Sequence, residues 1–183
     1  HNLLPGGAEV LQARKTALAR AEQTGLPTRR NENWHYTDLS RLLKYSDAAP
    51  VRADAFDASA LAPLQLVFEN GALINEPDAD DCVSVESLAR VLGSGARSHE
   101  HNASDNDMAA FNFAMAQDGA VMTINATPAR ALELVTRGHE AAHLRHTLKV
   151  ESGTVTVIEN LQADGYTNVV LDVDVAPGAR VAL

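Results

Sequence analysis

The sequence contains few of the residues on which several functional classes depend. Cys82 is the only cysteine among 183 residues, so an internal disulfide is excluded and a reducing compartment is expected. One thiolate does not hold a metal cluster either, because such clusters usually take about four protein ligands. We therefore interpret Cys82 as a small apolar side chain, packed in the interior.

Aromatic residues, basic charge and long apolar runs are also scarce. Aromatics make up 4% of the chain, which disfavours surfaces that stack nucleic-acid bases. The formal net charge of −9 argues against binding to phosphate backbones and to anionic membranes. No apolar run approaches the roughly 18 residues of a membrane span, and residues 1–7 lack a signal-peptide pattern. We expect a cytoplasmic protein that binds neither nucleic acid nor membrane.

The chain begins with a predicted helix over residues 8–24, which Gly25 ends. The segment that follows contains the only tryptophan. Trp34 and Tyr36 are two residues apart, so an extended segment would place both rings on one side and let them clamp the helix to the body. We assign this structural role to Arg29, Arg30, Trp34, Tyr36, Thr37 and Asp38. Arg29 and Arg30 also suit a carboxylate or phosphate ligand, although pairing with a nearby acidic residue is the simpler use.

Shorter elements are predicted in the middle of the chain. Asn70-Gly71 between two apolar runs predicts a hairpin over residues 64–74, because the pair favours a tight turn with positive φ. A short strand near residues 83–85, a helix over 86–92 and a second helix over 108–117 follow. The stretch between these helices has no periodicity and is expected to be a loop.

From residue 120 onward the pattern has a period of two, which indicates half-buried strands. Val150 and Val175 each open a valine-x-x-glycine corner, and the two corners, with glycines at 153 and 178, are 25 residues apart. A constant offset with glycine corners is typical of a solenoid. An ordinary β-sandwich also explains short strands between glycine turns.

A literal zinc-peptidase pattern occurs at His139-Glu140-Ala141-Ala142-His143. On a helix, both histidines and His146 would share a face suited to zinc, with Glu140 as general base. The alternation that continues through Leu148 favours a strand instead. In that interpretation His146 is a partly buried, neutral imidazole, and His143 and Arg145 point outward.

Two further clusters have simpler explanations. His99, Glu100 and His101 are expected in a solvated loop that binds metal only incidentally. The acidic residues Asp78, Asp80 and Asp81 lack the glycine and terminal glutamate of a calcium-binding EF-hand loop.

The run Gly25-Leu26-Pro27-Thr28-Arg29-Arg30, followed by Trp34 and then Tyr36-Thr37-Asp38-Leu39, resembles the start of the SufD family. That family belongs to the SufBCD iron–sulfur cluster assembly complex. The segment 108–120 is similar to the family's helix and strand that lead into its core. His35 departs from the pattern, since the family usually has lysine or arginine there.

The resemblance implies a mainly β fold with a right-handed parallel β-helix core beginning near residue 120. Residues 1–119 would form a helical and α+β region, and 120–183 the start of a longer core that continues past Leu183. It also implies a non-catalytic scaffold subunit that is not an enzyme. Its partners would be a SufB-like subunit and a SufC-like ATPase, with a homodimer as a further option, and it would hold no cofactor in this segment. A zinc-dependent peptidase and a carbohydrate-active or acyl-transferring β-solenoid are the alternatives.

Overall fold

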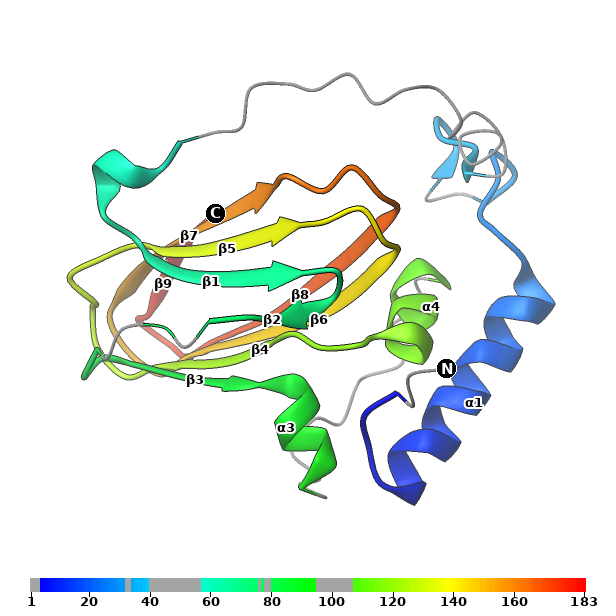
Figure 1. The fold of residues 1–183 in the computed structure, drawn as a ribbon, viewed down its shortest axis with the longest axis horizontal. Coiled ribbons are helices and arrows are strands. Elements are labelled where there is room, and N and C mark those ends of the chain that lie inside the picture. The colour runs from blue at the N-terminus through cyan, green and yellow to red at the C-terminus, as the bar shows by residue number, and fades with distance from the viewer. Residues whose placement is uncertain (1–3, 32–33, 40–56, 76, 78–79, 95–106) are drawn as a thin grey trace.

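A computed structural model describes residues 4–31, 34–39, 57–75, 77, 80–94 and 107–183 of the chain. It is a mixed α/β structure with two mostly parallel sheets (Figure 1). The helices are α1 (Ala8–Thr24), the short 3-10 helix η2 (Ser59–Leu61), α3 (Leu88–Gly93) and α4 (Asp107–Met115). The strands are β1 (Leu64–Glu69), β2 (Ala72–Leu73), β3 (Val83–Ser87), β4 (Ala120–Ile124), β5 (Leu132–Arg137), β6 (Ala142–Val150), β7 (Thr154–Leu161), β8 (Thr167–Val175) and β9 (Arg180–Ala182).

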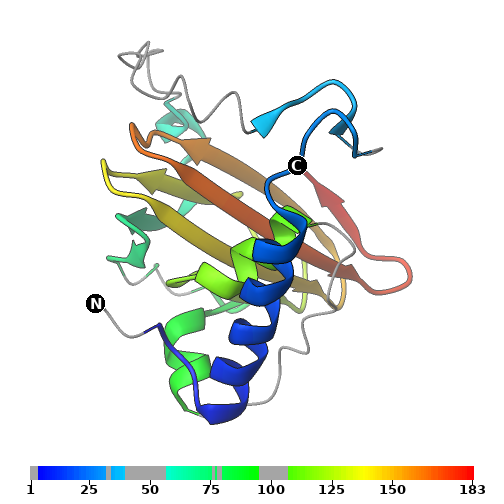
Figure 2. The ribbon, with the colours of Figure 1, turned by 90° about the vertical axis from the view of Figure 1, so that its right-hand side faces the viewer.

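The N-terminal helix has the bounds that the sequence predicts. Gly25 follows it with a φ of 70°, and its N–H donates to the carbonyl of Ala21 at 2.9 Å. This left-handed residue stops the helix, because a side chain there would be strained. Helix α1 packs against α4, and α4 packs in turn against β6 and β8, so α4 lies between α1 and one sheet (Figure 2).

The predicted hairpin is also confirmed. β1 and β2 pair antiparallel, and Phe68 lies opposite Leu73. Asn70 and Gly71 form the turn between them with φ values of 49° and 83°. Positive φ at both central residues matches the twist of the flanking strands, which explains the choice of Asn-Gly.

From β4 onward, successive strands alternate between the two sheets. The strand order is β2-β1-β5-β7-β9 in one sheet and β3-β4-β6-β8 in the other. Pairing from β4 to β9 is parallel within each sheet, whereas β2 and β3 are antiparallel to their neighbours. β1 pairs in parallel with β5 along its whole length. Residues before and after position 120 therefore contribute to both sheets.

The two glycine corners found in the sequence occupy equivalent positions. Val150 pairs with Val175, and the following glycines, Gly153 and Gly178, have φ values of 82° and 87°. A Cβ on Gly153 would lie 2.4 Å from the backbone nitrogen of Thr127 in the adjacent corner. The corners thus stack closely, which requires glycine at position 153 for both its conformation and its lack of a side chain.

The core lies between the sheets and consists of apolar side chains, mostly aliphatic, from alternate positions of the strands. Phe68, Met122 and Leu144 are among its fully buried members. The inward face of β8 is only half-buried, with Val169 and Leu171 packed against the core from one side. Among the described residues, no helix combines the length and the apolar character needed to cross a membrane.

Candidate functional site

The motif predicted to clamp the helix lies in residues 27–31 and 34–39, which we call the arm loop. Its backbone is turned rather than extended. The N–H of Trp34 donates to the carbonyl of Asn31 at 2.9 Å, and the N–H of Thr37 donates to the carbonyl of Trp34 at 2.8 Å. The expectation of an extended segment with both rings on one side is therefore wrong. The sequence pattern misled because local turn hydrogen bonds override a two-residue spacing this short.

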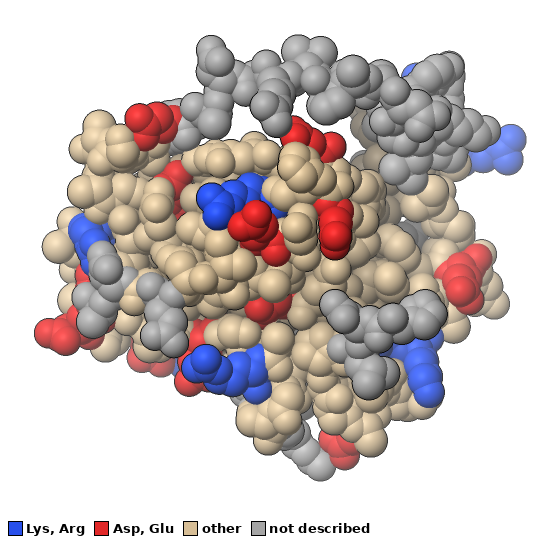
Figure 3. All heavy atoms as spheres, viewed as in Figure 1, with Lys and Arg blue, Asp and Glu red and all other residues tan. Residues whose placement is uncertain are grey.

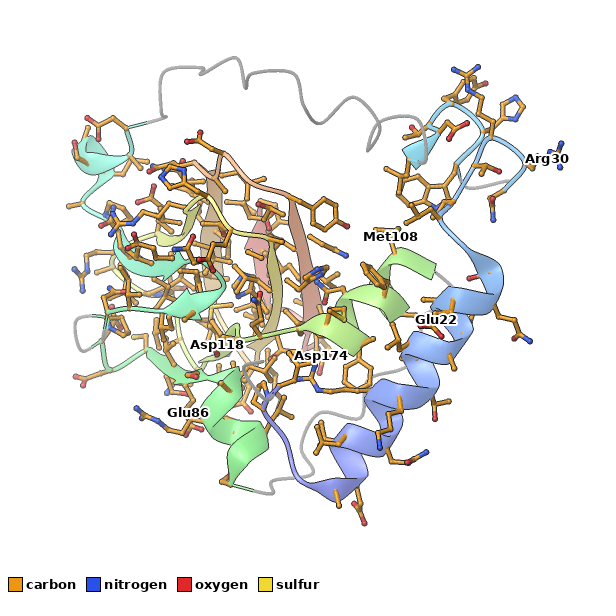
Figure 4. All side chains as sticks on the ribbon, turned by 45° about the vertical axis from the view of Figure 1, so that its right-hand side comes forward. Glu22, Arg30, Glu86, Met108, Asp118 and Asp174 are labelled. Carbon is orange, nitrogen blue, oxygen red and sulfur yellow. The ribbon has the colours of Figure 1, made fainter. Side chains whose placement is uncertain are left out.

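The arm loop places its motif residues in different environments. Trp34, Thr37 and Asp38 are half-buried, whereas Arg29 and Arg30 are exposed. Tyr36 is 91% exposed, and its ring meets the ring of His35 edge-on with centroids 5.0 Å apart. Tyr36 therefore contributes nothing to pinning the helix. Figure 4 shows Arg30 at the outer tip of this loop, far from Asp118.

Helix α1 is held to the body by a buried arginine that the sequence analysis missed. Arg14 is 4% exposed and donates from Nη1 to the carbonyls of Phe113 at 2.8 Å and Ala114 at 3.4 Å. Both carbonyls belong to the last turn of α4, where the helix dipole is negative. The guanidinium also lies over the Phe113 ring, 5.6 Å from its centroid. Burial lowers the pKa of Arg14 to about 10, so the side chain stays protonated at neutral pH.

We expect Arg14→Ala to release α1 from α4. Hydrogen bonds from a charged donor contribute about 1.5–3 kcal/mol, and α1 buries no other residue fully. Hydrogen exchange should therefore accelerate along α1, while the amides of β5 and β6 keep their protection. Lys15→Ala, an exposed change at the next position, is the matched control. Unaltered exchange of α1 in Arg14→Ala would show that other contacts hold the helix.

The zinc-peptidase pattern spans a corner and a strand. His139 and Glu140 lie in the corner before β6, and His143 lies on β6 itself. His139 is exposed and pairs through Nδ1 with Asp164 at 3.2 Å, while His143 packs between the rings of Phe111 and Tyr166. This backbone does not place the two histidines on one helical face. The strand interpretation of the segment is confirmed.

The outward face of β6 is covered by α4. His143 and Arg145 point away from the space between the sheets, as expected, but they are only 7% and 3% exposed. Arg145 donates to the carbonyl of Ala109 on α4 at 3.3 Å and pairs with Asp172 on β8 at 2.6 Å. Asn112 of α4 donates to the carbonyls of Leu144 and Asn168. This polar layer attaches α4 to the sheet, and sequence alternation alone gave no sign of it.

Asp118 forms the most highly connected polar centre of the described residues. Its carboxylate accepts hydrogen bonds from Ser87 Oγ at 2.9 Å and from the N–H groups of Ala89, Gly119 and Leu73 at 2.9, 2.8 and 3.1 Å. The side chain is 6% exposed and joins β2, the start of α3 and the start of β4. It acts as a structural anchor, because its four hydrogen bonds tie β2, β3, α3 and the start of β4 together.

His146 lies next to this centre, in the core between the sheets. It is fully buried, its Nδ1 accepts from the N–H of Ala120 at 3.0 Å, and its ring packs edge-on against Phe68. Burial lowers the pKa of His146 to about 4, because a charge there would lose its hydration; the nearby Asp118 carboxylate opposes this only in part. The imidazole is therefore neutral near pH 7, as the sequence analysis expected.

The remaining candidates do not form a site in the described part of the chain. Asp80 and Asp81 lie in the turn before β3, and Asp80 Oδ1 accepts from the N–H of Cys82 at 2.8 Å. Cys82 is half-buried. Within the described ranges no group of three or more His, Cys, Asp or Glu residues is placed to hold a metal ion. Asp78, His99, Glu100 and His101 lie outside the described residues.

Comparison with known proteins does not assign the chain to a family. No protein-family model matches the chain. No curated protein matches it either.

Proposed function

We propose that the protein is a non-catalytic scaffold subunit of the SufD type, acting in the SufBCD iron–sulfur cluster assembly complex. The proposal rests on the resemblance of residues 25–39 and 108–120 to that family. It is supported by one structural observation, the alternation of β4 to β9 between two sheets with a repeat near 25 residues. A stack of this kind is stiff and presents long surfaces to partners without needing a pocket.

We further propose that this alternation is the beginning of a right-handed parallel β-helix. Each pair of strands along the chain makes one circuit, and Leu132 of β5 lies beside Val157 of β7 in the next circuit. Connections between parallel strands are overwhelmingly right-handed, which gives the expected hand. The antiparallel strands β2 and β3 then close the first end of the stack. Solenoids need such a distinct terminal unit to protect their interior.

The environment of the buried charged groups favours a structural role over a catalytic one. Glu133 is 1% exposed and accepts from Gln65 Nε2 and Asn160 Nδ2, each at 2.7 Å. Asp118, Arg14 and Arg145 are likewise bonded to groups that hold elements together. Catalytic groups are instead poised toward a substrate cavity, with pKa values tuned for proton transfer. No observation favours the zinc peptidase or the carbohydrate-active alternative.

The proposed partners are a SufB-like subunit and a SufC-like ATPase in the cytoplasm, with self-association as an additional mode. Cofactor handling would belong to the assembled complex. Acidic and basic side chains are interspersed over the face seen in Figure 3, with no gathering of basic residues there. That distribution agrees with protein partners rather than with a nucleic-acid backbone.

Co-expression with SufB-like and SufC-like proteins from the source genome tests this function. We expect the tagged natural chain to retain both proteins through size-exclusion chromatography as one complex. A chain that elutes alone, while SufB and SufC bind each other, would contradict the scaffold role. Tagging each protein in turn controls for tag interference.

A further inference from the structure

The turn between β1 and β2 contains the one Asn-Gly pair of the sequence, Asn70-Gly71. Asparagine loses its side-chain ammonia most readily before glycine, because glycine has no side chain to shield its backbone nitrogen. Asn70 is exposed to solvent. The turn therefore brings together both reactants of a deamidation, the side-chain amide of Asn70 and the backbone nitrogen of Gly71.

The side chain of Asn70 is held by the adjacent corner, which connects β5 to β6. Its Oδ1 accepts from the N–H of His139 at 3.0 Å and from the N–H of Glu140 at 3.2 Å. The backbone N–H of Asn70 donates to the carbonyl of Arg137 at 3.1 Å. A Cβ on Gly138 would lie 2.1 Å from Asn70 Oδ1, so the amide fits against this corner because residue 138 is glycine.

Deamidation requires the turn and this side chain to leave their positions. The Gly71 nitrogen bonds to Asn70 Cγ, the bond from Cγ to the side-chain nitrogen breaks, and the displaced nitrogen leaves as ammonia with the proton from Gly71. Water then adds to either carbonyl of the succinimide ring and breaks its bond to nitrogen, which gives aspartate or isoaspartate.

The folded geometry opposes ring closure at two points. The five-membered ring fixes ψ of residue 70 at a value that a paired type I′ turn excludes, and the φ values of 49° and 83° at Asn70 and Gly71 match that turn. The two hydrogen bonds to Oδ1 also keep the amide plane on the neighbouring corner, away from the rotation that attack on Cγ demands.

We infer that Asn70 is a deamidation site that the corner between β5 and β6 protects. Modification proceeds in the fraction of molecules whose hairpin has opened locally. Isoaspartate carries an additional methylene in the main chain, so the turn no longer fits the pairing of Glu69 with Ala72. The N–H of Leu73, which donates to Asp118, is displaced with it. The inference depends only on the fold and is independent of the proposed SufD function.

Peptide mapping by mass spectrometry with isoaspartate detection, during prolonged incubation at mildly alkaline pH, tests this inference. The same chain unfolded in guanidinium chloride gives the unprotected rate, and Asn70→Gln assigns the signal to position 70. Gly138→Ala places a methyl group where Asn70 Oδ1 now lies. Gly153→Ala is the matched control, because it introduces the same strain at a positive φ and a close backbone contact in another corner. Glu140→Pro removes one of the two N–H donors and serves as a second variant if Gly138→Ala does not fold.

We expect position 70 to react at least about tenfold more slowly in the folded natural protein than in the unfolded chain, because two hydrogen bonds must break first. Gly138→Ala should recover most of the unprotected rate, and Glu140→Pro should react about threefold faster than the natural protein. Gly153→Ala should react as slowly as the natural protein, at a temperature where melting curves show every variant to be folded. Equal rates in the folded and unfolded natural chain overturn the inference. Equal acceleration in Gly138→Ala and Gly153→Ala also overturns it, because global stability rather than the corner would then control the reaction.

Discussion

Asp118→Ala is expected to lower the free energy of unfolding by about 3 kcal/mol or more, one of the largest effects of any single change in this protein. The carboxylate accepts four hydrogen bonds from groups in β2, α3 and the β3 and β4 ends, and it is almost fully buried. Alanine would leave three backbone N–H groups in that space without an acceptor. Each such buried donor costs about 1–3 kcal/mol, and water entering the space recovers part of the loss.

Chemical denaturation of Asp118→Ala, Asp118→Asn and the natural protein measures this effect. Asparagine keeps one acceptor oxygen, so it should retain the bonds now made by Oδ1 and lose the bond from Leu73. We therefore expect an intermediate loss of stability. Asp174→Ala is the control, because Asp174 is exposed on β8. A difference below about 1 kcal/mol between Asp118→Ala and Asp174→Ala would show that the anchor is dispensable.

The second large effect is a loss of stability in mild acid, caused by His146. Its pKa is lowered to about 4 in the folded protein, whereas an unfolded histidine titrates near pH 6.5. The unfolded chain therefore binds a proton at a pH where the folded protein does not. The stability contributed by the neutral ring is full above about pH 6.5 and is lost progressively as the pH falls toward 4. The difference between the two pKa values corresponds to about 3 kcal/mol.

Denaturation of the natural protein and of His146→Gln between pH 7 and pH 4 checks this expectation. Glutamine stays neutral, and its amide oxygen is able to accept from the N–H of Ala120 in place of Nδ1. The decline of stability with acid should be much shallower in this variant. A smaller decline should remain, because burial also lowers the pKa of His143. His35→Gln, at an exposed position, controls for removal of a histidine; identical pH profiles of His146→Gln and the natural protein would exclude His146 as the cause.

Local patterns in the sequence were sufficient to predict the elements whose conformation depends on neighbouring residues. Gly25 marks the end of α1, and Asn70-Gly71 defines the turn of the hairpin, because both depend on positive φ at a particular residue. The matching corners at Gly153 and Gly178 indicated a structural repeat, and β6 pairs with β8 in the register that this spacing requires. Strand alternation predicted a partly buried His146, and the structure buries it completely.

Only the tertiary structure determined which polar residues are buried and which side chains of the arm loop are exposed. Asp118 lies 31 residues from Ser87, Arg14 lies 99 residues from Phe113, and neither pairing leaves a periodic trace in the sequence. His143 and Arg145 have outward positions on β6, but only the packing of α4 makes them buried. Tyr36 was expected to pack, and the turns of the arm loop expose it instead. Short-range backbone preferences are determined by adjacent residues. Hydrogen bonds between distant segments form only after the sheets and helices have packed together.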